Sequence, residues 1–214
     1  MTSVTTDTLL LASSLAVPPG SVVIELGCGS GGAILASSAL NADCRWIGID
    51  VQIELLQMMI RSIRLRRKHI DLAGICCDVE AVPRILTGAI TDAVIMNPPF
   101  GKITSGRSSP VRTRRISRSG SDLLLYYFIR ASAHLLISGG LFIMINRPAL
   151  LPKMILGCKS AGIAPEILQP VGPAGKPAGH IILHGRKDSS AALKILPQIE
   201  SEQFIRKITQ GQSI

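Results

Sequence analysis

The sequence predicts an α/β protein: a Rossmann-like, three-layer αβα sandwich around a mostly parallel sheet of seven strands. Short, nearly continuous apolar segments alternate with longer segments in which apolar residues recur at helical spacing. Strands of that composition are buried on both faces, as in parallel sheets. A glycine-rich turn also joins the first apolar segment to a helix. Because 214 residues can bury one full core, we expect residues 1–214 to form a single domain.

The strands are expected where β-branched and other apolar residues run between turn residues. They are residues 22–26, 45–50, 72–77, 92–96, 141–145, 166–171 and 180–184. The helices are expected from the glycine turn to about residue 40, over 53–67 and 122–136, from after 148 to about 161, and over 202–209. Residues 101–121 break this alternation as a long loop, and residues 198–214 form a polar C-terminal tail.

Charge and cysteine content narrow the class of protein. The net charge is +9, from 23 Lys and Arg against 14 Asp and Glu, which favours a polyanion partner over an uncharged one. A basic protein without such a partner remains the alternative. The five cysteines include no CxxC pair, which indicates reduced thiols and no zinc site. His180 and His184 lack acidic or thiolate companions, so we expect no metal.

No segment is typical of a signal peptide or a membrane span. The apolar stretch 9–17 follows Asp7, lacks a basic region before it and ends at Pro18-Pro19-Gly20. The apolar run 135–145 is interrupted by Ser138-Gly139-Gly140 and is too short to cross a bilayer. We therefore expect a cytoplasmic protein that does not contact membranes.

The glycine-rich turn has the sequence Glu25-Leu-Gly27-Cys28-Gly29-Ser-Gly31-Gly32. Its glycines satisfy GxGxxG, so a dinucleotide site has to be considered. The second predicted strand ends at Asp50, and Asp78 follows the third. In a doubly wound sheet these strand ends are neighbours, so the three carboxylates would surround one crevice.

Three carboxylates would repel a pyrophosphate and suit S-adenosylmethionine (SAM), which has a sulfonium, an ammonium and no phosphate. Asp50 would accept hydrogen bonds from the ribose hydroxyls, and Asp78 from the adenine amino group. Asp78 could instead begin a helix without touching a ligand, and Cys28 would contact the cofactor through its backbone amide. The expected cofactor-binding residues are Glu25, Gly27, Cys28, Gly29, Gly31, Asp50, Val51, Asp78, Val79 and Asn97.

The tetrapeptide Asn97-Pro98-Pro99-Phe100 follows the fourth predicted strand. Two prolines fix the backbone and remove two amide donors. The turn therefore holds a neutral carboxamide and an aromatic ring at the edge where open α/β sheets bind ligands. Such a pair suits the methylation of a planar amine, because acceptors aimed at the amine hydrogens localise its lone pair and stabilise the developing charge. All four residues are the expected catalytic residues.

The glycine turn, the strand-end acids and this tetrapeptide together resemble the class I SAM-dependent methyltransferases that act on amino nitrogens. The resemblance implies that the Asn97 side chain and the Pro98 carbonyl hold the two hydrogens of the target amine. It also implies that Phe100 stacks on the plane of the target.

A basic loop directly after the tetrapeptide indicates which amine is methylated. Residues 101–121 contain no acid, and their cations would neutralise phosphates beside the active site. A solvated run of charge is the alternative. The cations are Lys102, Arg107, Arg112, Arg114, Arg115 and Arg118.

The C-terminal sequence from Lys176 through His180 and His184 to Arg186-Lys187 is similar to that of the bacterial tRNA1(Val) adenine N6-methyltransferases. The resemblance implies methylation of adenine N6 at position 37 of tRNA, and it adds Lys176, Arg186 and Lys187 to the expected RNA contacts. Three alternatives stay open: a guanine N2-methyltransferase of rRNA, a protein glutamine N5-methyltransferase, and a catalytically silent RNA-binding module that keeps the fold.

Overall fold

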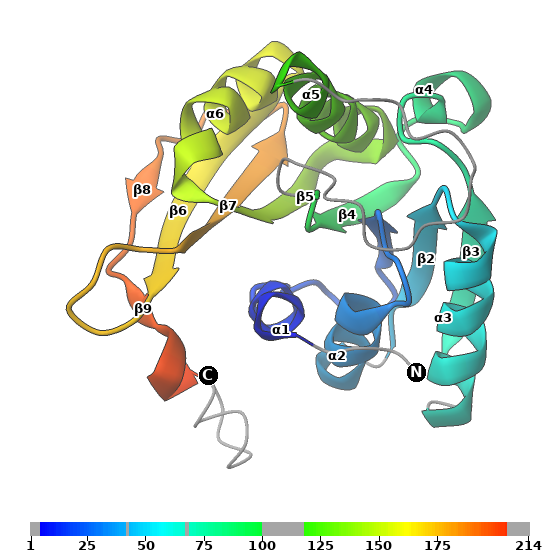
Figure 1. The fold of residues 1–214 in the computed structure, drawn as a ribbon. Helices are drawn as coiled ribbons and strands as arrows, with labels where there is room; N and C mark the ends of the chain where they lie inside the picture. The colour runs from blue at the N-terminus through cyan, green and yellow to red at the C-terminus, as the bar shows by residue number, and fades with distance from the viewer. Residues whose placement is uncertain (1–4, 42, 67–68, 100–117, 205–214) are drawn as a thin grey trace.

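The computed structural model describes residues 5–41, 43–66, 69–99 and 118–204, with only the backbone described for 118–122. All strands belong to one sheet (Figure 1). They are β1 (Val22–Leu26), β2 (Arg45–Asp50), β3 (Asp71–Cys76), β4 (Thr91–Met96), β5 (Leu136–Asn146), β6 (Ile163–Gly172), β7 (His180–Lys187), β8 (Lys194–Ile195) and β9 (Ile199–Glu200).

The strand order confirms the predicted mostly parallel, doubly wound sheet. The order is β3-β2-β1-β4-β5-β7-β6-β8, with β9 also pairing with β6. Strands β3, β2, β1, β4 and β5 are parallel to one another, whereas β7 runs antiparallel to both β5 and β6. The seven predicted strands are all present, and the two-residue strands β8 and β9 lengthen the sheet beyond the prediction.

Helices cover both faces of the sheet (Figure 1). Helices α1, α2 and α3 lie on one face, and α4, α5 and α6 on the other. The bounds of the helices are α1 (Thr6–Ser13), α2 (Gly32–Leu40), α3 (Ile53–Arg66), α4 (Val82–Ile85), α5 (Arg118–Leu135), the 3₁₀ helix η1 (Pro148–Leu150) and α6 (Leu151–Ser160).

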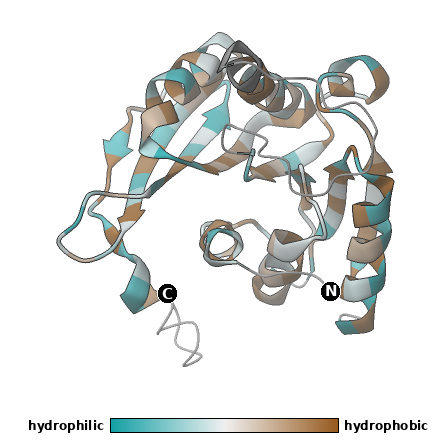
Figure 2. Cartoon of the chain, viewed as in Figure 1, coloured by the Kyte–Doolittle hydropathy of each residue, from teal (hydrophilic) through white to brown (hydrophobic). Residues whose placement is uncertain are grey.

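The core forms two apolar layers, one on each face of the sheet. Alternate residues of a strand point to opposite faces, so Ile24 packs with α5 and α6 while Val23 packs with α1, α2 and α3. Figure 2 shows hydrophobic residues recurring along the strands and on the helices that cover them. The central strands are therefore mostly apolar on both faces, as predicted for a sheet covered on both sides.

The main departures from the predicted elements occur at their ends. The apolar stretch that begins at residue 9 lies largely in α1, which the sequence had not predicted as a helix. Helix α5 begins at Arg118 rather than at 122, so the predicted loop 101–121 is shorter at this end. The predicted polar tail contains β9, and residues 201–204 are helical.

The Ser138-Gly139-Gly140 segment is a bulge inside β5, not a turn before it. Leu136 pairs with Thr91, and Leu141 pairs with Ala93, so β5 has extra residues at this point. Gly139 adopts φ +76°, a conformation that favours glycine. The bulge lets β5 begin directly after α5.

In the described part of the chain, no helix is both long and apolar enough to cross a membrane.

Candidate active site

A crevice of about 380 Å³ lies at the carboxyl edge of the sheet, where β1, β2, β3 and β4 end. This edge is where open α/β sheets bind their ligands. One wall comes from α5. The lining residues are Gly27, Gly29, Asp50, Val51, Gln52, Leu55, Cys77, Asp78, Val79, Asn97, Pro99, Leu124 and Phe128.

The glycine-rich turn forms the floor of this crevice between β1 and α2. Gly27, Gly29 and Gly31 have φ values of +68°, +51° and +79°, which side-chain-bearing residues rarely adopt. A Cβ on Gly27 would also lie 3.1 Å from the Phe128 ring. The turn therefore requires glycine at residue 27 for two reasons, its backbone conformation and the close approach of α5.

Four backbone amides of this turn are bonded within the protein. Gly27 N and Cys28 N donate to the Ile49 carbonyl at 2.8 and 3.2 Å, and Gly31 N donates to the Cys28 carbonyl at 2.8 Å. Gly29 N donates to Asp50 Oδ2 at 2.8 Å. A glycine-rich phosphate site uses such amides to hold the anion. These four amides therefore favour a cofactor without phosphate over a dinucleotide.

Asp50 is fixed in place by two backbone amides. Its Oδ2 accepts from Gly29 N at 2.8 Å and its Oδ1 from Gln52 N at 2.9 Å. The residue is 8% exposed and lines the crevice. Each carboxylate oxygen can accept more than one hydrogen bond, so Asp50 is a preorganised acceptor for a pair of hydroxyls.

Asp78 and two valines form the opposite end of the crevice. Asp78 Oδ1 accepts from Glu80 N at 3.0 Å, so it stabilises the turn before α4 and also lines the crevice. Val79 is buried beside it, whereas Val51 is 63% exposed. An exposed apolar side chain beside an acceptor suits a planar base, which would cover Val51 and donate to Asp78.

Three of the expected cofactor residues do not line the crevice: Glu25, Cys28 and Gly31. Glu25 is 4% exposed, and its Oε2 accepts from Ile34 N at 3.2 Å. The expected contact through the Cys28 amide is wrong, because that amide donates to Ile49 O. The Cys28 thiol is buried, which raises its pKa above the ordinary value. Cys28 and Gly31 shape the turn.

Asn97 lies at the point where β4 enters the crevice, and Pro99 follows it on the rim. Asn97 Oδ1 is buried and has no hydrogen-bond partner among the described residues. Pro98 is buried and Pro99 is exposed. Phe100, expected to stack on the target, lies outside the described residues. An unbonded buried carbonyl oxygen costs about 1–3 kcal/mol, so Asn97 is poised to accept from a donor.

Five lining residues were not predicted for the site: Gln52, Leu55, Cys77, Leu124 and Phe128. Leu124 and Phe128 are four apart on α5 and therefore lie on one helix face. Their spacing indicated an apolar face, but periodicity does not distinguish a core residue from a pocket wall. Cys77 follows β3 directly, and its position beside Asp78 was the available signal.

Comparison with known proteins agrees with this site. Residues 19–99 match a family described as "Putative methyltransferase". No curated protein sequence matches the chain significantly. A structure described as a predicted O-methyltransferase, from Agrobacterium tumefaciens, superposes with a TM-score of 0.77 at 22% identity, covering 96% of each chain.

Two further structures share the fold. TrmN from Thermus thermophilus has a TM-score of 0.59 at 18% identity, over 85% of this chain and 48% of that one. A geranyl diphosphate methyltransferase in complex with GPP and sinefungin has a TM-score of 0.59 at 12% identity, over 85% and 76%. These findings support a SAM-dependent methyltransferase with SAM as its cofactor.

The crevice residues fit SAM. Asp50 offers acceptors to a ribose, and Asp78 and Val51 suit an adenine. The remaining lining residues, among them Gly27, Asn97 and Phe128, would hold the methionine part.

The predicted RNA contacts divide into three groups. Lys102, Arg107, Arg112, Arg114 and Arg115 lie outside the described residues, and Arg118 begins α5, described by its backbone alone. Lys176 is exposed in the β6–β7 connection, at the carboxyl edge of the sheet, because Val171 pairs with His180 there. Lys176 therefore lies on the same edge as the crevice.

Arg186 and Lys187 lie at the edge of the sheet opposite the crevice. Arg186 pairs with Leu141 at the start of the regular part of β5. Its NH1 donates to the Gly139 carbonyl at 2.9 Å, and Lys187 Nζ donates to the Leu136 carbonyl at 3.2 Å. Both side chains stabilise the β5 bulge.

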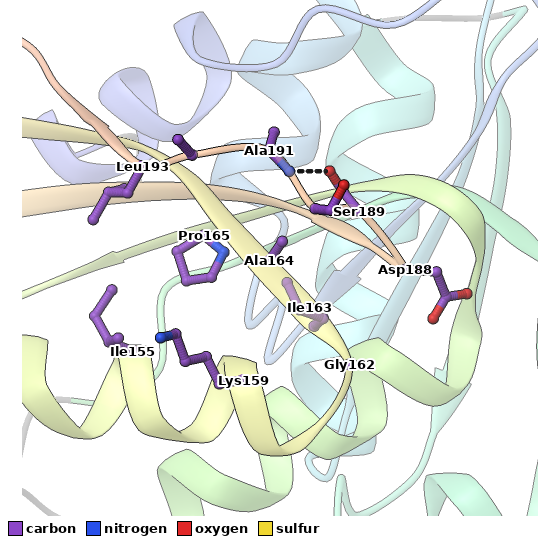
Figure 3. A pocket seen from close by; sticks show the side chains of 12 residues that line it. Ile155, Lys159, Gly162, Ile163, Ala164, Pro165, Asp188, Ser189, Ala191 and Leu193 are labelled. Carbon is purple, nitrogen blue, oxygen red and sulfur yellow. Dashed lines mark hydrogen bonds between the residues drawn. The ribbon is translucent and has the colours of Figure 1, made fainter.

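A second cavity, of about 670 Å³, lies away from the crevice (Figure 3). It lies between α6, the start of β6 and the segment after β7, with Lys159 and Ile155 on its helical side. Ser189 accepts from Ala191 N at 3.2 Å across its rim and donates to Glu166 at 2.6 Å. Because β6 begins at the edge opposite the crevice, this cavity is not part of the candidate active site.

Proposed function

We propose that this chain is a SAM-dependent N-methyltransferase that acts on an exocyclic amino group of RNA, with adenine N6 in tRNA as its substrate. The observation that carries the proposal is the buried Oδ1 of Asn97 at the edge of the SAM crevice, which has no hydrogen-bond partner among the described residues. An amine is the donor that such an acceptor lacks. The resemblance to amino-nitrogen methyltransferases at Asn97–Phe100 supports the same assignment.

Asn97 would act by positioning and by electrostatics. An aromatic amine is a weak nucleophile because its lone pair is delocalised into the ring. Acceptance of its hydrogens by Asn97 Oδ1 localises that lone pair and stabilises the charge that develops on nitrogen. When bound, SAM supplies the methyl group on a positively charged sulfur. The methylated ammonium then loses a proton readily, so the site needs no strong base.

The carboxylates of the crevice are arranged for binding rather than for proton abstraction. Asp50 is held by two amides, and Asp78 by the amide of Glu80. Asp50 ends β2 and Asp78 follows β3, whereas Asn97 follows β4 on the other side of β1. The carboxylates therefore lie apart from Asn97. This arrangement suits methyl transfer to an amine, which loses its proton after the reaction and needs no base, better than methyl transfer to a hydroxyl, which must lose its proton to a base first.

Charge and sequence support RNA as the carrier of this amine. The chain has a net charge of +9, and Lys176 lies on the edge that holds the crevice. The cationic set from Lys102 to Arg118 follows the Asn97–Phe100 tetrapeptide closely in the sequence. Polycations neutralise phosphates independently of sequence, so base choice would rest with Asn97 and its neighbours.

A substrate panel tests the proposal. Purified protein is incubated with methyl-labelled SAM and, separately, with tRNA, rRNA and a protein substrate containing an exposed glutamine. Label in tRNA that is lost in Asn97→Ala would support the proposal. Label in rRNA alone would favour the alternative of a guanine N2-methyltransferase of rRNA. Label in the protein alone, or SAM binding without any methyl transfer, would contradict the proposal that the chain is an RNA N-methyltransferase.

A further inference from the structure

Glu25 is a buried acid directly behind the SAM crevice. It is 4% exposed and is the penultimate residue of β1, two residues before Gly27, which lines the crevice. In the parallel register Glu25 pairs with Gly48 of β2. Because side chains alternate along a strand, Asp50 lies on the same face as Gly48 and therefore on the same face as Glu25. The two acids face the same side of the sheet at its carboxyl edge.

Glu25 also serves as the cap of α2. The N-cap residue of this helix is Gly31, which has no side chain to accept from the first turn. Glu25 Oε2 takes that role by accepting from Ile34 N at 3.2 Å. A protonated acid and a carboxylate can both accept this hydrogen bond, so the cap tolerates either form of Glu25.

No ion pair with a cation is recorded for Glu25 among the described residues. The groups that interact with it are Asp50 from β2, the Cys28 thiol from the turn and the Ile34 amide from α2. Burial raises its pKa to about 8, the Ile34 hydrogen bond opposes that rise, and Asp50 adds to it. A buried acid without a cation is stabilised in its neutral form.

We propose that Glu25 makes the crevice distinguish SAM from its product S-adenosylhomocysteine, because it ionises when the sulfonium binds and regains its proton when the neutral thioether remains. The sulfonium would be the cation that the buried acid lacks, acting across a space of low dielectric constant where charges interact strongly. The inference rests on SAM as the cofactor and is independent of the proposed RNA substrate.

The proton balance is simple. Binding converts the Glu25 carboxylic acid to a carboxylate and releases one proton to solvent. Methyl transfer removes the positive charge from sulfur, and Glu25 then takes one proton back from solvent. Below about pH 8, SAM affinity should rise by up to about tenfold per pH unit, with a smaller rise for the product.

Calorimetric titration tests this directly. SAM and S-adenosylhomocysteine are titrated into the protein between pH 6.0 and 7.5, each in two buffers of different ionisation enthalpy, which gives the number of protons released. The sulfonium also makes the α-amino group of SAM more acidic than that of the product, so the contribution of Glu25 is the part of the difference between the ligands that Glu25→Gln removes. We expect release of up to one proton with SAM, fewer with the product, and a smaller difference between the ligands in Glu25→Gln.

The control variant is Glu200→Gln, which removes an exposed acid on β9 and should behave like the wild type. If Glu25→Gln does not fold, infrared difference spectra of the wild type provide the second measurement. They should show loss of a protonated carboxylic acid band when SAM binds. Equal proton release for SAM and product in the wild type, or an unchanged difference in Glu25→Gln, would overturn the proposal. Neither measurement uses RNA, so a wrong substrate assignment cannot produce that result.

Discussion

At the residue scale, the site combines acceptors that are already bonded with one that is not. Asp50 accepts from Gly29 and Gln52 and is fixed before any ligand arrives. Asn97 Oδ1 lies buried with no partner in the part of the chain that the structure describes. The fixed carboxylate of Asp50 suits cofactor binding, whereas the Asn97 oxygen is suited to accept a hydrogen bond from the substrate. Asn97, Asp50 and Asp78 were all predicted from their places at strand ends, whereas the core position of the Cys28 thiol depends on packing that the sequence does not reveal.

Replacing Asn97 by Ala should lower the rate of methyl transfer by about 10²-fold or more, because one preorganised polar contact to the reacting amine is lost. SAM affinity should change little, since the adenosine end of the crevice is untouched. Single-turnover kinetics with tRNA and calorimetry with SAM measure the two effects. A variant that turns over normally would remove Asn97 from the chemistry.

Glu25 should make the ligand-free protein less stable as pH rises. Its folded pKa of about 8 exceeds the ordinary value, so the folded state holds a proton that the unfolded state has lost between about pH 4.5 and 8. The free energy of unfolding therefore falls across this window, with a slope of up to about 1.4 kcal/mol per pH unit. Urea unfolding of wild type and Glu25→Gln at several pH values measures it. Parallel pH profiles for the two proteins would contradict the assignment.

At the element scale, the β1–α2 turn is the most constrained segment. Its amides bond to Ile49, Asp50 and Cys28, its glycines need positive φ, and Gly27 lies against Phe128. The glycine pattern alone also allowed a dinucleotide turn, and the four bonded amides favour a cofactor without phosphate. The β5 bulge could not be predicted, because glycines mark turns and bulges alike and only pairing with β4 separates them.

Gly27→Ala tests the fit between this turn and α5. A side chain at φ +68° costs about 1–2 kcal/mol, and its Cβ would press on the Phe128 ring at 3.1 Å. We expect lower stability and SAM affinity weakened by about tenfold or more. Gly20→Ala is the matched control, since Gly20 has φ +84° with nothing within 4 Å. Gly20→Ala should lose stability but keep its SAM affinity; equal loss of affinity in both would show that strain alone is responsible.

At the scale of the whole molecule, a cation can contact a substrate in the crevice only if it lies at the same edge of the sheet as the crevice. Sequence similarity grouped Lys176, Arg186 and Lys187, but the antiparallel strand β7 carries the last two to the far edge. The strand order was predictable from the alternation of apolar segments and helices. The reversal of β7 was not predictable, because a short apolar strand has the same composition in either direction.

Lys176→Ala should weaken tRNA binding uniformly and lower the slope of log affinity against log salt by about 1, as expected for one phosphate contact. Arg186→Ala should leave that slope unchanged and cost about 1 kcal/mol or less of stability through the lost bond to Gly139. Filter binding over a range of salt concentrations compares the two. The opposite pattern would place the RNA on the other edge of the sheet.

The central claim is that the methyl group is transferred to an exocyclic amine of RNA. The most direct test is to incubate the purified protein with methyl-labelled SAM and RNA from a strain lacking the gene, digest the RNA and identify the labelled nucleoside by mass spectrometry. We predict label in N6-methyladenosine from tRNA. Label on a ribose oxygen or a ring carbon, with none on an exocyclic nitrogen, would contradict the account.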